Sequence, residues 1–253
     1  MVTFIAAASP LTSLSMTLES LLISRDAALL GVLRPTLEKM SVNVEVCPEI
    51  QPGGEILAKR KFDAVIVDCD DLQGGMDLLV NLRKTHSNSS SVAFAVLNGN
   101  TTTQDAFKLG ANFVLQKPLT PLNATRCFNA ALNFMVRERR RYFRHPVDMQ
   151  VRVGLPEQPE LSAKATNLSE GGMALRLTGK LPKNATAHVR FTLPNSNISL
   201  ELLGTVAWTD ASGNSGIKFI DVPQSSQYQL EKWLTDRLKD ELPSQLHGYM
   251  KEQ

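Results

Sequence analysis

An arginine cluster stands in the middle of the chain and is the first stretch whose residue types could do chemistry. Arg139, Arg140, Arg141 and Arg144 belong to residues 137–144, a run of eight that contains five arginines. Guanidinium groups are planar and permanently charged, so they fork onto phosphate oxygens and stack on aromatic bases. The cluster therefore suits a ligand that is both anionic and aromatic, such as a nucleotide. A solvated basic face at the end of a helix would show the same pattern.

A second polar stretch, residues 167–172, reads Asn-Leu-Ser-Glu-Gly-Gly and lies between two strand-like runs. The side chains of Asn167 and Ser169 are short and can hydrogen-bond to the edge of a ligand. Gly171 and Gly172 would let the backbone approach a ligand closely. Alone, the stretch is typical of a polar hairpin turn.

Together the two stretches resemble the PilZ domain family, whose hallmark is R-x-x-x-R followed by [DN]-x-S-x-x-G. Arg140 and Arg144 supply the first element. Asn167, Ser169 and Gly172 supply the second. PilZ domains are receptors for cyclic di-GMP, and the resemblance implies that ligand for this chain.

The resemblance also implies a role for each of these side chains. Arg140 and Arg144 would clamp phosphates and stack on guanine faces, and their neighbours in the cluster would assist. The amide and hydroxyl of the second element would bind guanine or ribose edges, and its glycines would admit the ligand. The predicted cyclic di-GMP site consists of Arg139, Arg140, Arg141, Arg144, Asn167, Ser169, Gly171 and Gly172.

Length and composition limit the classes of protein to consider. A chain of 253 residues, 43% hydrophobic and 21% charged, is long enough for two globular domains. Its net charge of only +2 argues against bulk nucleic-acid binding, so we expect no DNA or RNA partner. Cys47, Cys69 and Cys127 lack metal-ligand spacing and are typical of reduced thiols in a cytoplasmic protein. No apolar run approaches the ~20 residues of a membrane span.

Strands and helices alternate over residues 18–136 and predict a doubly wound (βα)5 parallel sheet, so the fold class of this part is α/β. The apolar run 64–67 predicts a buried central strand, and the spacing over 122–140 predicts a long final helix. Helical spacing also covers 27–40, where Pro35 is expected to kink or split the helix.

This first domain resembles the receiver domain of two-component signalling. Residues 62–68 match the family's phosphoacceptor strand, which ends at Asp68. Lys117 and the proline after it match the family's Lys-Pro, which implies that the lysine contacts a phosphoryl group. Receiver domains hold Mg²⁺ with two adjacent acidic residues after the first strand. Here only Asp26 can act as such a ligand, and Arg25 would place a positive charge beside the metal. Phosphoryl transfer depends on that metal.

We therefore predict a pseudo-receiver that serves as a docking or dimerisation module, with no cofactor. The alternative is a phosphorylation-controlled response regulator in which Asp68 accepts the phosphoryl group and the second domain binds a protein. Asp70 and Asp71 fit the pattern of solvated loop acids, although Asp70 could replace a metal ligand.

Short alternating strands follow residue 146 and predict an all-β part, a six-stranded antiparallel barrel. A helix that begins near residue 225 would cover one barrel end. The predicted division is a disordered tail (1–17, with Met1 or Met16 as the true start), a receiver-like domain (18–136), a PilZ domain (137–240) and a flexible tail (241–253).

No motif of a nucleophile with its base, of a zinc protease or of a phosphate-binding loop occurs, so we predict a non-enzyme. No Gly or Pro lies between Asn123 and His145, so the final helix can run into the arginine cluster without a flexible linker. The sequence therefore predicts a cytoplasmic, bacterial-type effector in which cyclic di-GMP rearranges two domains and signals to an unidentified protein partner. A homodimer through the first domain is also considered.

Overall fold

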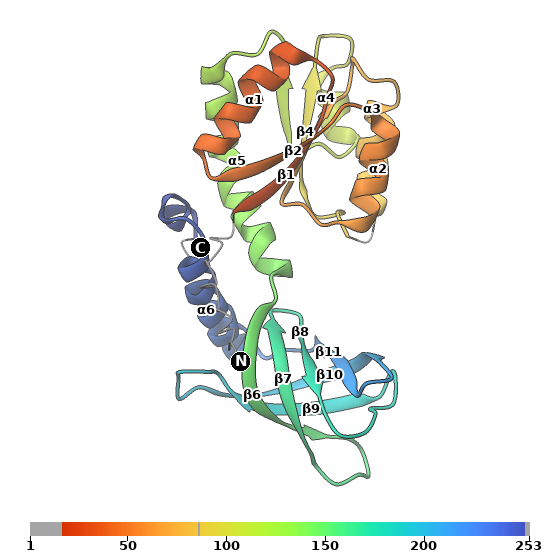
Figure 1. The fold of residues 1–253 in the computed structure, drawn as a ribbon, viewed down its shortest axis with the longest axis vertical. Helices are drawn as coiled ribbons and strands as arrows, with labels where there is room; N and C mark the ends of the chain where they lie inside the picture. Colours follow the sequence, from red (N-terminus) through yellow and green to blue (C-terminus); the bar gives the residue numbers. More distant parts are fainter. Residues whose placement is uncertain (1–16, 86, 251–253) are drawn as a thin grey trace, which may run out of the picture.

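The computed structural model describes residues 17–85 and 87–250. Figure 1 shows a sheet wrapped by helices above a small β-barrel, with one long helix leading from the first part into the second. The predicted tail over 1–17 and the choice of start residue lie outside the described residues, apart from Thr17. No helix in the described part of the chain is long and apolar enough to cross a membrane.

The first domain is a five-stranded parallel sheet in the order β2-β1-β3-β4-β5, as predicted. Its strands are β1 (Leu18–Ile23), β2 (Val42–Cys47), β3 (Ala64–Asp68), β4 (Val92–Leu97) and β5 (Phe113–Gln116). Its helices are α1 (Ala27–Lys39), α2 (Ile50–Lys59), α3 (Gly75–Lys84), α4 (Thr103–Lys108) and α5 (Pro121–Tyr142). In a sheet of this order, ligand sites lie beyond the C-terminal ends of the strands.

Helices cover both faces of this sheet, which explains why its central strands are apolar throughout. Every residue of β3 and β4 is buried. α1 and α5 pack on one face, where Leu33 and Phe128 are fully buried. α2 and α3 pack on the other face through Leu57 and Leu79. Pro35 does not split the helix as expected, because α1 includes it without a break.

The second domain is a closed six-stranded antiparallel barrel in the order β10-β11-β8-β7-β6-β9, as predicted. Its strands are β6 (His145–Gly154), β7 (Leu161–Ser169), β8 (Gly172–Arg176), β9 (Thr186–Thr192), β10 (Ser199–Thr209) and β11 (Asn214–Ile220). Buried and exposed residues alternate along the whole of β9, because successive side chains point to opposite faces of a strand. Val151, Leu175 and Val189 fill the inside together with other apolar side chains.

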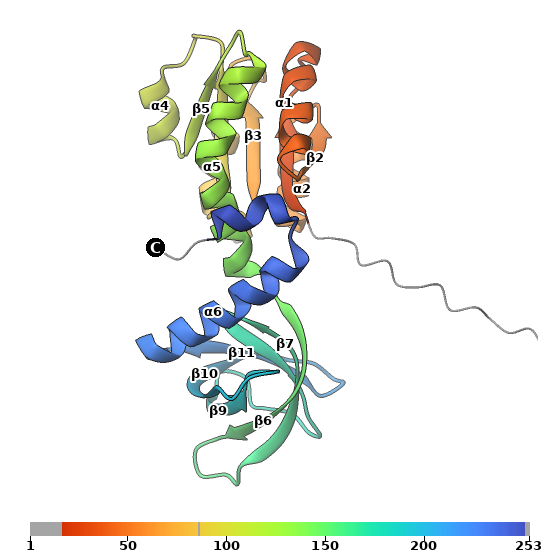
Figure 2. The same ribbon diagram turned by 90° about the vertical axis from the view of Figure 1, so that its left-hand side faces the viewer.

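A C-terminal segment connects the two domains. It consists of α6 (Gln224–Glu241) and the 3-10 helix η1 (Ser244–Tyr249), and we call residues 224–250 the C-terminal brace. Leu230 and Leu234 of α6 belong to the barrel core. Leu238 and Leu246 belong to the core that α1 and α5 form with the sheet. Figure 2 shows the brace crossing the junction between the domains, so each domain buries part of it.

The predicted flexible tail over 241–253 needs correction for the residues that the structure describes. Leu246 is 1% exposed and Met250 5% exposed, and both pack on the first domain. Ser41 of the first domain donates a hydrogen bond to Gln245, with 2.6 Å between Oγ and Oε1. The stretch is too short and polar for its sequence to predict a packed element. Its few apolar residues are buried by a domain that is distant in the sequence.

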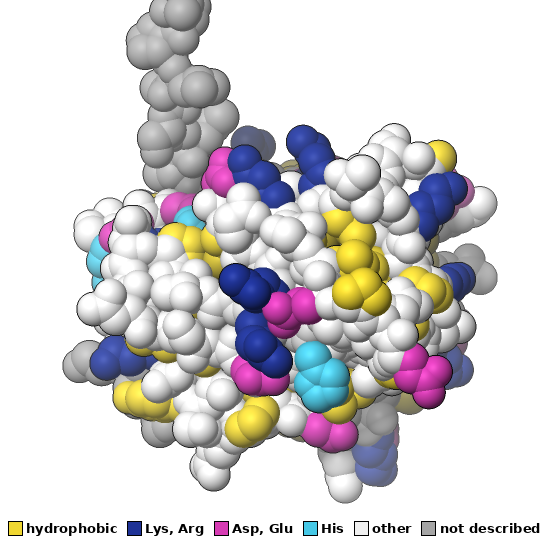
Figure 3. All heavy atoms as spheres, turned by 90° about the horizontal axis from the view of Figure 1, so that it is seen from below, with side chains coloured by type: hydrophobic (Ala, Val, Ile, Leu, Met, Phe, Trp, Pro, Cys, Tyr) yellow, Lys and Arg dark blue, Asp and Glu magenta, His cyan; other side chains and the backbone are white. Residues whose placement is uncertain are grey.

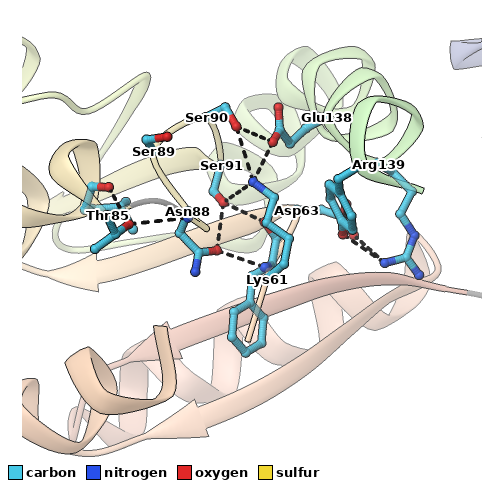
Figure 4. Close-up of polar contacts among 12 residues, drawn as sticks. Lys61, Asp63, Thr85, Asn88, Ser89, Ser90, Ser91, Glu138 and Arg139 are labelled. Atoms are coloured by element: carbon cyan, nitrogen blue, oxygen red, sulfur yellow. Dashed lines mark hydrogen bonds and ion pairs between the residues drawn. The ribbon is translucent and has the colours of Figure 1, made fainter. Parts of the chain in front are cut away.

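The end of α5 is anchored to the first domain by the polar contacts of Figure 4. Lys61 Nζ lies 2.5 Å from Glu138 Oε1. The Tyr142 hydroxyl donates to Asp63 Oδ1 over 2.8 Å, and an Arg139 nitrogen lies 3.6 Å from the same carboxyl group. α5 therefore runs past the predicted domain boundary and carries the arginine cluster as part of a helix held to the first domain.

Leu246→Ala should lower the free energy of unfolding by about 2–5 kcal/mol, because it leaves a cavity between the brace and the first domain. Leu122→Ala is the matched control, since the Leu122 side chain on α5 is 58% exposed, and it should change stability by less than about 0.5 kcal/mol. Urea unfolding of the full chain measures both. Equal losses in the two variants would mean that the brace does not pack on the first domain.

Candidate ligand site at the domain junction

The barrel brings the two predicted motif elements side by side. β6 pairs with β7 in an antiparallel register that sets Pro146 opposite Asn167 and His145 opposite Leu168. Arg144 directly precedes β6, so it enters the barrel beside the end of β7 that carries Asn167. The elements, which are separate in the sequence, thus meet at the barrel end that receives α5.

Arg139 is directed to the first domain, away from the second motif element, and its predicted role beside the ligand stays a prediction. Its Nη2 donates to the backbone oxygen of Thr17 over 2.9 Å, and its guanidinium pairs with Asp63. Burial raises the pKa of Asp63 to about 6, and the charge of Arg139 opposes that shift. Turning Arg139 toward a ligand would leave a buried charge without its partner, so we assign it to the anchor of α5.

Arg140, in contrast, contacts the second motif element. Its Nε lies 2.8 Å from Oε1 of Glu170, and both atoms are buried from solvent. The contact has the distance of an ion pair without the alignment of a hydrogen bond. Arg141 and Arg144 are exposed. The positive charge of the motif is therefore divided between one arginine paired within the site and two that face solvent.

The residues of the second motif element differ in their hydrogen-bond partners and in the access that they give to the backbone. Asn167 Oδ1 is buried and has no hydrogen-bond partner among the described residues. Ser169 Oγ donates to the backbone oxygen of Gly172 over 3.0 Å. A Cβ at Gly172 would come within 2.1 Å of the backbone oxygen of Ile217, so the packing of β8 on β11 alone explains this glycine. A Cβ at Gly171 would meet no described atom within 4 Å, so the backbone there is accessible.

A cavity of about 250 Å³ lies between this turn and α6. It is lined by Glu170, Val222, Gln227, Leu230 and Glu231. Burial raises the pKa of Glu170, and the charge of Glu231 adds to that shift, whereas Arg140 and Arg141 oppose it. The cavity therefore carries negative charge that the arginine motif balances.

The first domain holds a second charged cluster at the C-terminal ends of its strands. Lys117 Nζ lies 2.8 Å from Asp26 Oδ2 and 3.0 Å from Asp68 Oδ2. It also contacts the carboxylate of Asp71. Ser24 Oγ donates to Asp68 Oδ2 over 2.7 Å. The structure thus brings the predicted phosphoacceptor, Asp26 and Lys117 together.

This cluster has the donor chemistry of a divalent-cation site. Carboxylate oxygens of Asp26, Asp68 and Asp71 lie within 4.8 Å of one another, and hard cations such as Mg²⁺ prefer such ligands. Asp68 Oδ1 is buried and lacks a hydrogen-bond partner in the part of the chain that the structure describes. The ammonium group of Lys117 contacts all three carboxylates, so a bound cation would have to share them with this charge.

Comparison with protein families gives a match over the second half of the chain. Residues 138–236 match the model of the PilZ domain. The matched residues include the end of α5, all six barrel strands and most of α6. Residues 138–236 form a PilZ domain. The resemblance inferred from the two motif elements is confirmed.

Solved structures similar to this chain include receiver domains. The CheY-like receiver domain protein of Methanospirillum hungatei is 20% identical, covering 49% of this chain and 99% of its own, with a TM-score of 0.42. The chemotaxis response regulator CheY4 of Vibrio cholerae is 16% identical, covering 46% and 98%, with a TM-score of 0.42. The inhibitor of motility of Bacillus subtilis is 20% identical, covering 40% and 52%, with a TM-score of 0.35. No curated protein matches the chain.

The far end of the PilZ barrel holds a groove of about 960 Å³ between β6, β7, β9 and β10. Figure 3, seen from the barrel end, shows basic and acidic side chains next to one another. Arg190 lies 3.4 Å from Glu160 and 3.2 Å from Glu201, and Arg152 lies 3.2 Å from Glu160. The charges in this groove balance one another, and the motif residues of the PilZ domain are not among its lining.

The acidic partners of the basic residues do not stand out in the sequence. Glu170 stands inside the second PilZ element, and its position beside Ser169 is the one signal that could have marked it as a partner for an arginine. Asp71 contacts Lys117 and is not merely a solvated loop acid. Asp70, considered as a loop acid that could replace a metal ligand, accepts hydrogen bonds from the hydroxyl of Thr101 and the Asn98 backbone.

Asp68 should form no phosphoryl adduct with acetyl phosphate in the presence of Mg²⁺. Its side chain is 1% exposed, and Ser24 and Lys117 hold one of its oxygens, which disfavours its attack on a small phosphodonor. Intact-mass measurement after incubation tests this, with Asp68→Asn as the control. An adduct in the wild type that disappears in the control would favour a phosphorylation-controlled regulator.

Proposed function

We propose that this protein is a cyclic di-GMP receptor whose PilZ domain holds the ligand at the junction with the first domain. The observation that carries the proposal is the β6–β7 register, which sets Asn167 opposite Pro146, two residues after Arg144. Because of this register, arginines suited to phosphate and an amide suited to a base edge are within reach of a single molecule.

Each group at the junction has a counterpart on a cyclic dinucleotide. Arg140 and Arg144 would bind the phosphodiester oxygens and stack on the guanines. The buried Oδ1 of Asn167 is an acceptor that needs a donor, and the edge of guanine offers N–H donors. Ser169 adds a hydroxyl group, and the open backbone at Gly171 admits the ligand. The donor set therefore favours a guanine-containing anion over a simple phosphate.

The ligand would act on the angle between α5 and the barrel. Arg140 belongs to α5, which is anchored to the first domain, whereas Asn167 belongs to β7. Only Phe143 and Arg144 separate α5 from β6. A ligand that contacts both sides binds one orientation better than another and shifts the population toward it. The C-terminal brace is a second connection, so its packing must adjust when the angle changes.

The second candidate function is a response regulator controlled by phosphorylation of Asp68. The three carboxylates around Lys117 support it, because their oxygens suit the metal that phosphoryl transfer requires. The burial of Asp68 and its bonds to Ser24 and Lys117 weigh against it. We therefore favour a first domain that transmits the ligand signal without a phosphoryl group of its own.

A protein partner, or a second copy of the chain, has an apolar surface available on the first domain. Phe107 of α4 and Phe134 of α5 are 48% and 55% exposed. Phe134 also packs edge-on against Phe113 of β5, with 5.7 Å between ring centroids. Exposed apolar patches that contain large aromatic side chains are typical of interaction sites. We further propose a cytoplasmic location, which the free thiols support.

Arg144→Ala should weaken cyclic di-GMP binding about tenfold or more, because it removes a charge-assisted contact worth ~1.5–3 kcal/mol. Calorimetric titration of the full chain measures the affinity. Arg152→Ala is the matched control, since Arg152 is an exposed arginine of β6 at the far end of the barrel. Equal affinities for the wild type and Arg144→Ala, or no heat from the wild type, would refute the proposed function.

Cyclic di-GMP should slow hydrogen exchange at residues 143–145 and at Asn167–Ser169, because the ligand ties the α5–β6 connection to the end of β7. The small-angle scattering profile of the full chain should change on binding as the angle between the domains changes. Arg144→Ala at the same ligand concentration is the control. Slower exchange at Asn167–Ser169 alone, with an unchanged profile, would show that the ligand binds without moving the domains.

A further inference from the structure

We propose that Glu170 is an internal competitor of the ligand, which occupies Arg140 in the ligand-free protein and must release it before a phosphate can bind. The inference rests on the proposed function and adds a regulating residue to that site. It is motivated by the Arg140–Glu170 ion pair, which joins the two elements of the ligand-binding motif to each other.

The pair places a carboxylate against a nitrogen of Arg140 that a phosphate could otherwise bind. A carboxylate and a phosphodiester both offer negatively charged oxygens to a guanidinium group. Oε1 of Glu170 lies 2.8 Å from Arg140 Nε, and solvent reaches neither atom. A ligand oxygen therefore cannot approach Nε while Glu170 stays in place. This makes the pair a contact that opposes binding.

The surroundings of Glu170 weaken its ion pair with Arg140, so that a ligand can displace Glu170. Burial disfavours its charge, and Glu231 of α6 repels it across the same cavity. Arg140 and Arg141 offset these effects. A ligand that supplies two phosphates and base edges offers Arg140 a better-bonded partner than this carboxylate does. The cavity of about 250 Å³ beside Glu170 gives the displaced side chain room to move.

A purely structural ion pair is the competing explanation, and the neighbouring arginine shows what such a pair looks like. Arg139 is paired with Asp63, which lies in the first domain and outside the ligand motif. That carboxyl group is also bonded to the Tyr142 hydroxyl and to the Glu19 backbone. Glu170, by comparison, lies within the motif and directly follows Ser169. Both carboxylates pair with an arginine. Glu170 differs from Asp63 because it lies within the ligand-binding motif.

Calorimetric titration of the full chain with cyclic di-GMP tests the inference. Glu170→Gln keeps the size and polarity of the side chain and removes its charge. We expect it to bind about tenfold more tightly than the wild type, because a pair that holds Arg140 for roughly nine-tenths of the time weakens the apparent affinity by that factor. Glu231→Gln removes a charge from the same cavity but leaves the Arg140–Glu170 pair in place and no longer repels Glu170, so it should bind no more tightly than the wild type.

A double-mutant cycle separates competition from simple repulsion. In an Arg140→Gln background, Glu170→Gln should bring no further gain, because the residue that it releases is gone. A gain of the same size in both backgrounds would show that Glu170 only repels the ligand, and would overturn the inference. Unchanged or weaker binding of Glu170→Gln, with a wild-type unfolding temperature, would overturn it as well. Absence of binding by both the wild type and Glu170→Gln would instead refute cyclic di-GMP as the ligand.

Discussion

The pairing between the start of β6 and the end of β7 is the constraint on which the junction depends. Because the register sets Pro146 opposite Asn167, the residue that enters the barrel from α5 always lies beside the second motif element. A slip of one residue would turn the side chains of β6 to the opposite face. The same slip would expose the apolar residues that fill the barrel, so packing of the core and assembly of the site are selected together.

Two connections of different kinds join the domains at this junction. α5 is covalently continuous with β6 and is held to the first domain by buried polar contacts around Asp63. The C-terminal brace returns from the barrel and contributes Leu238 and Leu246 to the first domain's core. The proposed ligand between Arg140 and Asn167 would therefore lie inside a closed loop of contacts. Any change in the angle there must be taken up by the brace, whose apolar contacts are less directional than those of α5.

What the sequence predicts well is local, and what it misses depends on distant partners. Continuous apolar runs identify β3 and β4, and alternation identifies β9, because burial on two faces or one imposes those periods. The motif predicts which residues gather at the junction. It cannot assign Arg139 and Arg140 different partners, since Asp63 and Glu170 reach them only through the tertiary fold. The packed end of the brace is missed for the same reason: Leu246 is buried by a domain that precedes it by more than a hundred residues.

The partners of the arginines indicate an order in which the proposed ligand would engage them. Arg139 is committed to a buried carboxyl group and keeps α5 in place. Arg144 is exposed at the barrel mouth and can meet a ligand first. Arg140, which lies between them in the sequence, is paired with a carboxylate whose charge is disfavoured by burial. A ligand held by Arg144 and Asn167 would then need only to exchange one anion for another at Arg140. Because Arg140 is part of α5, that exchange would be the step by which the proposed ligand, bound at the barrel, acts on the first domain.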